Sequence, residues 1–377
     1  MKHNWEYKKL GEVATYVNGY AFKPEEWKEE GLPIIRIQNL NDSDAPFNYY
    51  DGMIPSKFIV DNGDLLISWS ASLGVYEWNR GRAVLNQHIF KVVFDKSDIN
   101  KYFLKYAVFG QLENMAKNVH GATMKHIVKK DFDGTIIPVP PLPTQQRIVA
   151  ELDCISGILE KKRQQLKELD NLAQAIFYDM FGDPVENDKG WEVRKLGEIG
   201  TLARGVSKHR PRNAPELLGG EMPLIQTGDV ANSGMYITDY NSTYSEIGVA
   251  QSKVWQPGTL CITIAATIGK CSILTFAACF PDSVVGFIPN PNETTKEYVY
   301  YIFGCLQSIL EEDAPAVAQK NINLSILNEI NVPLPPLSLQ QQFAKKIEAI
   351  ERQEALINQS IKEVQTLFDC RMEEYFN

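Results

Sequence analysis

Three windows of the sequence gather Lys, Arg and His side chains and contain no acidic residue. They are residues 78–94, 114–130 and 199–215, and the Gly, Asn and Pro residues within them predict loops. In the third window, four Lys or Arg residues fall within nine positions. Lys and Arg neutralise phosphates, whereas Arg, Asn and Gln also bond the edges of bases. The windows therefore predict local contacts to a nucleic acid, and the alternative for each of them is a solvated loop.

The candidate nucleic-acid contacts are side chains of these windows and polar or basic residues close to predicted strands. In the first half of the chain they are Arg36, Gln38, Asn39, Arg80, Arg82, Asn86, Gln87, His120, Lys125 and His126. In the second half they are Arg204, Lys208, Arg210, Arg212, Gln226, Lys270, Lys320 and Asn321. Lys125 and Lys320 precede the last predicted strand of their halves and are candidates for phosphate contacts. The amides at 38–39 and 86–87 suit adenine edges, although such residues also commonly finish a strand.

The sequence shows no catalytic constellation beside these contacts. It lacks an Asn/Asp-Pro-Pro-aromatic tetrapeptide for amino-methyl transfer, the G-x-G-x-x-G fingerprint, and the G-x-x-x-x-G-K-S/T phosphate loop. The five His residues have no Glu partner at zinc-ligand spacing, and the six Cys residues form no C-x-x-C pair. We therefore expect no catalytic residue, no metal site and no cofactor in this chain. A glycosidase stays open as an alternative, because its paired carboxylates need no fixed spacing.

Composition limits where a nucleic acid can bind. The chain has 377 residues, of which 44% are hydrophobic and 23% charged, as in a folded protein of two or three domains. Lys and Arg total 38 against 47 Asp and Glu, so the net charge is -9 and contact with nucleic acid must be local. The amino terminus lacks the apolar stretch of a signal peptide, and Gly269 and Lys270 interrupt the apolar run at 260–280. With cysteines typical of reduced thiols, these features predict a cytoplasmic protein.

An internal duplication organises the chain. Residues 5–13 match residues 191–199 with six identities in nine, at an offset of 186. Residues 137–146 match residues 332–341 at an offset of 195, through a P-x-P-P-L-x-x-Q-Q motif. The chain is therefore a tandem repeat of one unit, with divergent segments between the matched anchors. Within each unit, short β-branched and aromatic runs predict a β-rich domain, and the Pro-rich motif predicts a stiff connector that neither strand nor helix can enter.

A long helix is predicted after each connector, over residues 144–181 and again 195 positions later. Apolar residues at alternating steps of three and four form a seam typical of a coiled coil. The seam residues are Ile148, Leu152, Ile155, Leu159, Leu166, Leu169, Ile176, Met180, Phe343, Ile347, Ile350, Ile357, Ile361, Val364, Phe368 and Tyr375. Only nine residues separate Phe181 from Trp191, which favours antiparallel packing of the two helices. The alternative is that each helix is buried separately on its own domain.

The chain resembles a known family in these features taken together. The Trp-Glu-x-x-x-Leu-Gly-Glu opening, the GLPIIRIQNL and EMPLIQTGDV segments, the Pro-rich connector and the tandem duplication are similar to the DNA-specificity (S) subunit of type I restriction-modification systems. The resemblance implies target-recognition domains at 1–143 and 183–338, and spacer helices at 144–182 and 339–377. It also implies a subunit without chemistry of its own, which binds DNA, two methyltransferase (M) subunits and restriction (R) subunits.

The expected fold is α+β, with two β-rich heads separated by an antiparallel two-helix coiled coil and related by an approximate two-fold axis. We call residues 1–143 the first head and residues 183–338 the second head. Because the heads differ in sequence, the two DNA half-sites should differ, which predicts a bipartite and asymmetric site. The alternative is a protein-binding coiled-coil scaffold without a DNA role, which would show no salt-sensitive affinity for duplex DNA.

Overall fold

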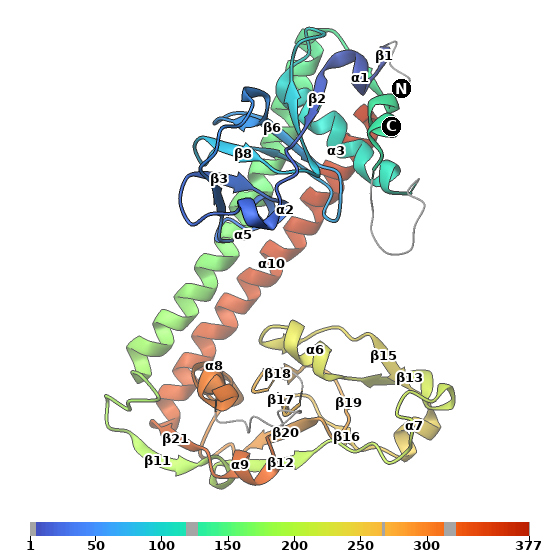
Figure 1. Ribbon diagram of the computed structural model, residues 1–377. Coiled ribbons are helices and arrows are strands. Elements are labelled where there is room, and N and C mark those ends of the chain that lie inside the picture. The colour runs from blue at the N-terminus through green and yellow to red at the C-terminus, as the bar shows by residue number, and fades with distance from the viewer. Residues whose placement is uncertain (1–4, 118–126, 266–267, 313–321, 377) are drawn as a thin grey trace. The chain divides into compact units, whose positions relative to one another are not determined.

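The computed structural model of the chain describes residues 5–117, 127–265, 268–312 and 322–376 (Figure 1). It divides into two compact units. One comprises Met1–Arg163 with Gln359–Asn377, and the other comprises Gln164–Asn358. Each unit therefore holds one head together with about half of each long helix.

The first head contains two four-stranded sheets and a separate strand pair. One sheet has the order β2 (Thr15–Asn18), β9 (Ile89–Val93), β6 (Leu65–Ser68), β7 (Gly74–Glu77). The other has the order β4 (Asn48–Tyr50), β3 (Leu32–Ile35), β8 (Ala83–Leu85), β5 (Ile59–Val60). The pair joins β1 (Glu6–Lys9) to β10 (Ile136–Val139). The helices are α1 (Leu10–Val13), η1 (Pro24–Glu26), α2 (Ile37–Asn41), η2 (Ser56–Phe58), α3 (Lys101–Lys117) and α4 (Lys129–Gly134).

The second head repeats this plan. One sheet has the order β12 (Gly200–Arg204), β20 (Val284–Pro289), β17 (Leu260–Thr263), β18 (Cys271–Leu274), β14 (Tyr236–Ile237). The other has the order β15 (Ser242–Tyr244), β13 (Leu218–Leu224), β19 (Ala278–Cys279), β16 (Val254–Trp255). The pair joins β11 (Glu192–Lys195) to β21 (Asn331–Leu334). The helices are η3 (Leu196–Glu198), η4 (Pro215–Leu217), α6 (Thr227–Asn232), α7 (Glu246–Ala250), α8 (Lys296–Glu312) and α9 (Leu324–Asn328).

The two heads share one topology, so the repeated sequence anchors mark a repeated fold. In the order of neighbouring strands, β2-β9-β6-β7 corresponds to β12-β20-β17-β18, and β14 adds a fifth strand in the second head. The sheet β4-β3-β8-β5 corresponds to β15-β13-β19-β16, and in both the two middle strands are parallel. The central strands β6 and β17 are buried along their whole length, as their mainly apolar sequences predict.

The two long helices are α5 (Leu142–Phe181) and α10 (Leu337–Phe376), and within each unit they pack antiparallel. In the unit that contains the first head, early residues of α5 meet the end of α10. Here the Tyr375 hydroxyl donates to Glu151 Oε2 at 2.7 Å, and Arg371 Nε lies 2.9 Å from Glu151 Oε1. In the other unit, the ring of Phe343 near the start of α10 contacts Phe177 and Phe181 near the end of α5. The predicted α+β class with two β-rich heads and an antiparallel helix pair is confirmed.

The predicted seam residues all lie on the buried side of the long helices, to different extents. The buried members are Ile148, Leu152, Ile155, Leu159, Phe343, Ile347, Ile350, Phe368 and Tyr375. The half-buried members are Leu166, Leu169, Ile176, Met180, Ile357, Ile361 and Val364. Toward the end of α5 the most buried positions are instead Ala173, Phe177 and Phe181.

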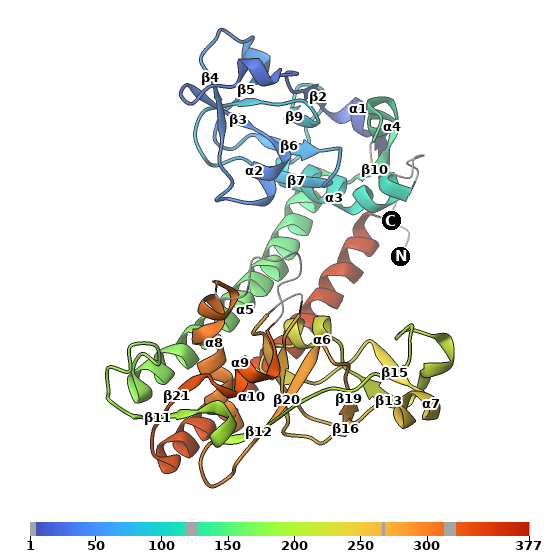
Figure 2. The same cartoon turned by 60° about the horizontal axis from the view of Figure 1, so that its bottom comes forward.

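The cause of this shift is α8, which lies beside the last turns of α5 (Figure 2). The Phe177 ring stacks on Tyr301 at 5.6 Å and on Tyr298 at 5.9 Å between centroids. The end of α5 therefore packs against the second head as well as against α10. For the last turns of α5, the predicted coiled-coil seam with α10 as its single partner is therefore incomplete.

The prediction that strands and helices stop at the Pro-rich connectors is wrong. Strand β10 includes Pro138, which pairs with Tyr7, and β21 includes Pro333, which pairs with Val193. Helix α5 includes Pro143 in its first turn. A two-stranded ladder leaves each strand one free edge, where Pro loses no hydrogen bond, and the first turn of a helix needs no N–H donor from Pro.

Candidate nucleic-acid interface

The strongest candidate site in the second head is the loop at residues 205–214, which we call the basic loop. Gly205 N donates to Val284 O at 2.8 Å, and Val206 N donates to Phe280 O at 3.1 Å. A Cβ atom on Gly205 would lie 2.2 Å from Phe280 O and 2.3 Å from Pro281 O. The loop therefore begins pressed onto the backbone of 280–284, and only glycine fits at the crossing.

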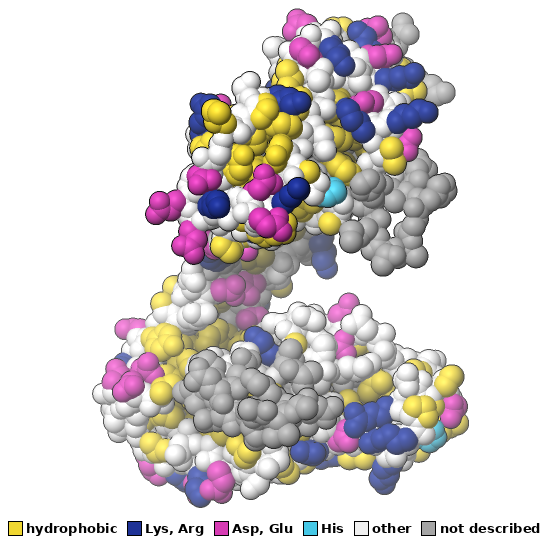
Figure 3. Space-filling view, in the orientation of Figure 1, with side chains coloured by type: hydrophobic (Ala, Val, Ile, Leu, Met, Phe, Trp, Pro, Cys, Tyr) yellow, Lys and Arg dark blue, Asp and Glu magenta, His cyan; other side chains and the backbone are white. Residues whose placement is uncertain are grey.

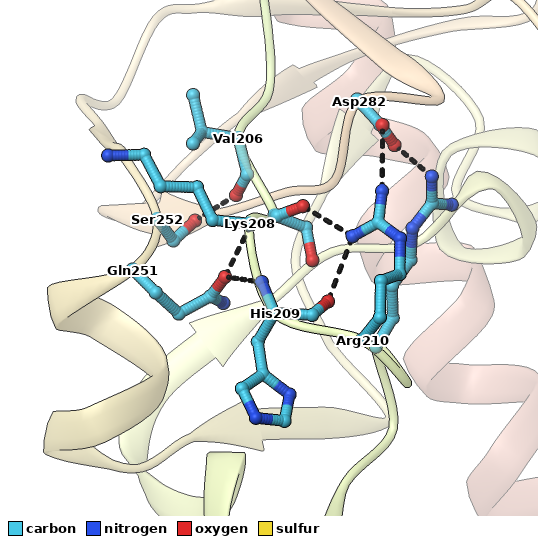
Figure 4. A network of polar contacts seen from close by, with 9 residues as sticks. Val206, Lys208, His209, Arg210, Gln251, Ser252 and Asp282 are labelled. Atoms are coloured by element: carbon cyan, nitrogen blue, oxygen red, sulfur yellow. Dashed lines mark hydrogen bonds and ion pairs between the residues drawn. The ribbon is translucent and has the colours of Figure 1, made fainter.

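Side chains that follow α7 hold the next turn of the basic loop. Gln251 Oε1 accepts hydrogen bonds from Lys208 N at 2.6 Å and from His209 N at 3.0 Å (Figure 4). Ser252 Oγ donates to Val206 O at 2.7 Å. The backbone of the loop is thus fixed, while the side chain of Lys208 projects into solvent.

Asp282 forms ion pairs with two arginines of the basic loop. Arg212 Nη2 lies 2.5 Å from Asp282 Oδ1. Arg210 Nη2 lies 3.5 Å from Asp282 Oδ2 (Figure 4). Arg210 also donates through Nη1 to the carbonyls of Ser207 at 2.6 Å and His209 at 2.8 Å. The three charged side chains keep between 34% and 54% of their surface exposed, so the cluster lies at the protein surface.

Acids from other segments therefore partly neutralise a window that contains none of its own. Besides Asp282, Glu216 lies 3.8 Å from His209 Nε2. Sequence reasoning missed Lys253, whose Nζ lies 3.6 Å above the centroid of the Trp255 ring and adds a positive charge next to Ser252. Lys and Arg side chains remain gathered on this part of the second head, near α7 and β16 (Figure 3). The surface can still attract an anionic backbone locally.

The first head has the same loop crossing with different side chains. Gly19 N donates to Ile89 O at 3.0 Å, and Tyr20 N donates to Leu85 O at 2.8 Å. A Cβ atom on Gly19 would lie 2.0 Å from Asn86 O, so this crossing also requires glycine, as the one at Gly205 does. Asn86 and Gln87 are half-buried on this crossing, and Asn86 Oδ1 accepts from Gln87 N at 2.9 Å. The segment touched by each crossing thus carries the amides Asn86 and Gln87 in the first head and the carboxylate Asp282 in the second, where arginines of the crossing loop pair with it.

Asn39 is buried and its amide is used inside the first head. Its Oδ1 accepts from Arg36 N at 3.1 Å, and its Nδ2 donates to Ala45 O at 3.0 Å and Pro46 O at 3.2 Å. These bonds cap α2 and hold the following loop. We therefore remove Asn39 from the candidate base readers. Its neighbour Gln38 is exposed, and Arg36 lies over the Trp27 ring at 5.4 Å.

The arginines of the first head's window 78–94 also have partners within the head. Arg80 lies over the rings of Trp78 at 4.6 Å and Phe47 at 5.2 Å, and it donates to the carbonyls of Ser43 and Asn39. Arg82 is exposed and lies 4.0 Å from Asp61. Arg80 is thus fixed by packing, whereas Arg82 remains accessible to an anion.

The other candidates of the second head lie apart from the basic loop in the chain. Gln226 is exposed, and its backbone N donates to Asp229 Oδ2 at 2.8 Å, which repeats the cap made by Asn39. Lys270 is half-buried and lines a cavity of about 320 Å³ with Tyr178 of α5 and Tyr301 of α8. The aliphatic stem of a Lys can pack on such a lining while its ammonium group faces water, so Lys270 stays a candidate contact.

Five further candidates cannot be placed. His120, Lys125, His126, Lys320 and Asn321 lie outside the described residues. Lys125 and Lys320 precede the last strand of their heads in the chain, and α4 and α9 come between them and that strand.

Neither a metal-binding cluster nor a membrane-spanning helix is found in the described part of the chain. Within it, no three His, Cys, Asp or Glu side chains gather closely enough to hold a metal ion. None of its helices combines the length and apolarity needed to cross a bilayer. Burial, rather than a catalytic partner, is the main cause of the raised pKa of Tyr106, to about 12.

Comparison with known proteins identifies the family. Residues 2–170 and 188–366 each match the type I restriction modification DNA specificity domain. The chain belongs to this family. It is similar to the type I restriction enzyme EcoBI specificity subunit of Escherichia coli, with 24% identity over 383 residues that cover 92% of this chain and 79% of the relative. It is also similar to the MjaVIII specificity subunit of Methanocaldococcus jannaschii, with 20% identity over 92% of this chain and 86% of the relative.

Solved structures of type I restriction-modification proteins share this fold. The S subunit from M. genitalium aligns with a TM-score of 0.61 at 16% identity, over 100% of this chain and 97% of its own. A chain from a study of complex assembly and conformational transition of the type I system aligns with a TM-score of 0.58 at 18% identity, over 98% of this chain and 97% of its own. The resemblance inferred from the sequence motifs is confirmed.

Proposed function

We propose that this chain is the sequence-specific DNA-recognition subunit of a type I restriction-modification complex and that its two heads read a bipartite, asymmetric site. The observation that carries this proposal is the double match to the DNA specificity domain, with each copy folded as one head of common topology. The family and its role follow from that match, and the division of the site between the heads is our inference.

The asymmetry of the site is supported by the loop crossings at Gly19 and Gly205. The backbone hydrogen bonds are the same, but Asn86 and Gln87 stand in the first head where Pro281 and Asp282 stand in the second, and Asp282 pairs with two arginines of the crossing loop. Amides pair with adenine edges and arginines with guanine edges or phosphates. Equivalent loops with different donors and acceptors would select different bases.

We further propose that 1–143 and 183–338 are the target-recognition domains and that 144–182 and 339–377 are spacer helices. The chain would supply recognition without catalysis, in the cytoplasm, and would dock two M subunits and R subunits that carry out methylation and cleavage. Support comes from the two 40-residue helices, which carry side chains exposed to solvent along their length, including Leu172 and Leu356.

Methylome sequencing tests this function. The chain is expressed with its M partner in a host without other modification systems, and a matched culture receives the M partner alone. We expect methylation at one motif with two different half-sites and a fixed spacer, only when the chain is present. A motif that forms without the chain would contradict a recognition role.

A further inference from the structure

We propose that Asp282 is a positioning residue that holds Arg212 to read a guanine edge in the half-site of the second head. The proposal rests on the proposed function and specifies its chemistry at one position, a G·C pair read by a guanidinium fork. It distinguishes the basic loop from one that only binds phosphates.

The contacts of the two arginines assign them different roles. Arg210 uses Nη1 for two carbonyls, Ser207 O and His209 O, and Nη2 for Asp282. Arg212 has a single ion pair among the described residues, from Nη2 to Asp282 Oδ1. Arg210 is therefore tied into the loop, whereas the remaining donors of Arg212 are available to a ligand. A carboxylate on one side of a guanidinium leaves its other edge able to donate two parallel hydrogen bonds.

Asp282 is well placed for this role because its segment is rigid. Phe280 is fully buried and stacks on Trp255 at 4.7 Å between centroids. Val284 N donates to Pro281 O at 3.0 Å, and the backbone on both sides of Asp282 accepts the hydrogen bonds of the basic loop. An arginine held by such a support loses little freedom when it meets a base, and its orientation is set in advance.

A carboxylate in this position would be unfavourable for a loop that only binds phosphates. It cancels part of the charge of Arg210 and Arg212 and repels the DNA backbone equally for every sequence. Removing it should then strengthen binding to all duplexes alike. Removing a support for base reading should instead weaken discrimination between sequences. The two roles of Asp282 therefore predict different responses of the ratio of affinities.

The experiment measures binding of the assembled M–S complex to two fluorescent duplexes. One carries the recognition motif found by methylome sequencing, and the other carries the same motif with its half-sites scrambled. Anisotropy titrations at several salt concentrations compare wild type with D282N, which removes the charge and nearly preserves the shape. We expect the ratio of cognate to scrambled affinity to fall at least about fivefold. The affinity for the scrambled duplex should stay equal or rise.

Two further variants make the result interpretable. R212K keeps the positive charge but loses the guanidinium fork, so it should lower the ratio as D282N does while the salt dependence stays unchanged. E221Q removes the charge of an exposed carboxylate on β13 and should leave the ratio at the wild-type value. If D282N does not assemble, R212K alone decides the question.

Three outcomes are distinguishable. An equal rise in both affinities for D282N, or an unchanged ratio in R212K, would overturn the guanine-reading role and leave the loop as a phosphate contact. An unchanged affinity in both variants would place the basic loop away from DNA and overturn the proposal as well. A wild-type complex without any preference for the cognate duplex would instead refute the proposed function itself.

Discussion

Single residues at corresponding positions cap α2 and α6 in the same way. Asn39 accepts from Arg36 N in the first head, and Asp229 accepts from Gln226 N in the second. The two differ in their remaining bonds, since Asn39 donates to the carbonyls of Ala45 and Pro46, whereas Asp229 Oδ1 accepts from Asn241 at 2.6 Å. Each side chain satisfies its own buried surroundings and is not interchangeable with the other.

Replacing Asn39 should therefore affect stability before it affects recognition. N39A removes the partner of the backbone N of Arg36 and of Ala45 O, and it leaves Pro46 O with the bond from Arg36 Nη2 alone. The free energy of unfolding should fall by about 1–3 kcal/mol. N39D keeps the acceptor but brings a carboxylate against the carbonyls of Ala45 and Pro46, so it should not restore the wild-type stability. Urea unfolding measures both, with Q38A at the exposed neighbour as the control. A fully stable N39A complex with altered specificity would show that Asn39 reads DNA after all.

Glu351 on α10 gives stability a dependence on pH. Burial, followed by the nearby charges of Glu354 and Asp170, raises its pKa from 4.5 to about 7. Between these two values the folded chain binds a proton more tightly than the unfolded chain, so stability should decrease as pH rises through this range and stay lower above it.

The variant E351Q removes this titration. We expect it to be more stable than wild type at pH 8, by about 1 kcal/mol after allowance for the partial exposure of the side chain, and the difference should shrink toward pH 5. Thermal melts across this range measure the effect. E373Q, at an exposed carboxylate of the same helix, serves as the control and should follow the wild-type profile. A wild-type profile for E351Q would mean that Glu351 is ionised without cost in the folded chain.

At the scale of elements, the long helices do more than pair with each other. The heptad spacing predicted both helices to within two residues at each start, because a seam of apolar residues at steps of three and four is a strong local signal. It did not predict that Phe177 would pack against Tyr298 and Tyr301 of α8. That contact joins residues more than 100 positions apart, and helical periodicity carries no information about it.

The end of α5 offers a direct comparison between neighbouring positions. F177A removes a buried ring that also contacts Phe181 and Phe343, and should lower the free energy of unfolding by about 3–5 kcal/mol. I176A removes a half-buried side chain from the predicted seam and should cost clearly less. Chemical unfolding of both variants tests the assignment. Equal losses of unfolding free energy, or a larger loss for I176A, would show that the end of α5 packs mainly through the predicted seam against α10.

At the scale of the whole molecule, the duplication was readable from the sequence and the surface chemistry was not. The anchors at 5–13 and 191–199 indicated two copies of one unit, and the strand orders of the two heads agree with this. The acid-free windows, however, become surfaces with Asp61 beside Arg82 and Asp282 beside Arg212. These pairs are made by loops that meet only after folding, so charge counted along the chain overstates the positive potential.

The most direct measurement of the central claim is a head exchange followed by methylome sequencing. Residues 1–143 are replaced with the first head of another specificity subunit of this family, and the hybrid is expressed with the same M partner. If each head reads its own half-site, one half of the methylated motif should change while the other half and the spacer length stay the same. A change in both halves, or an unchanged motif in an active hybrid, would contradict recognition by two independent heads.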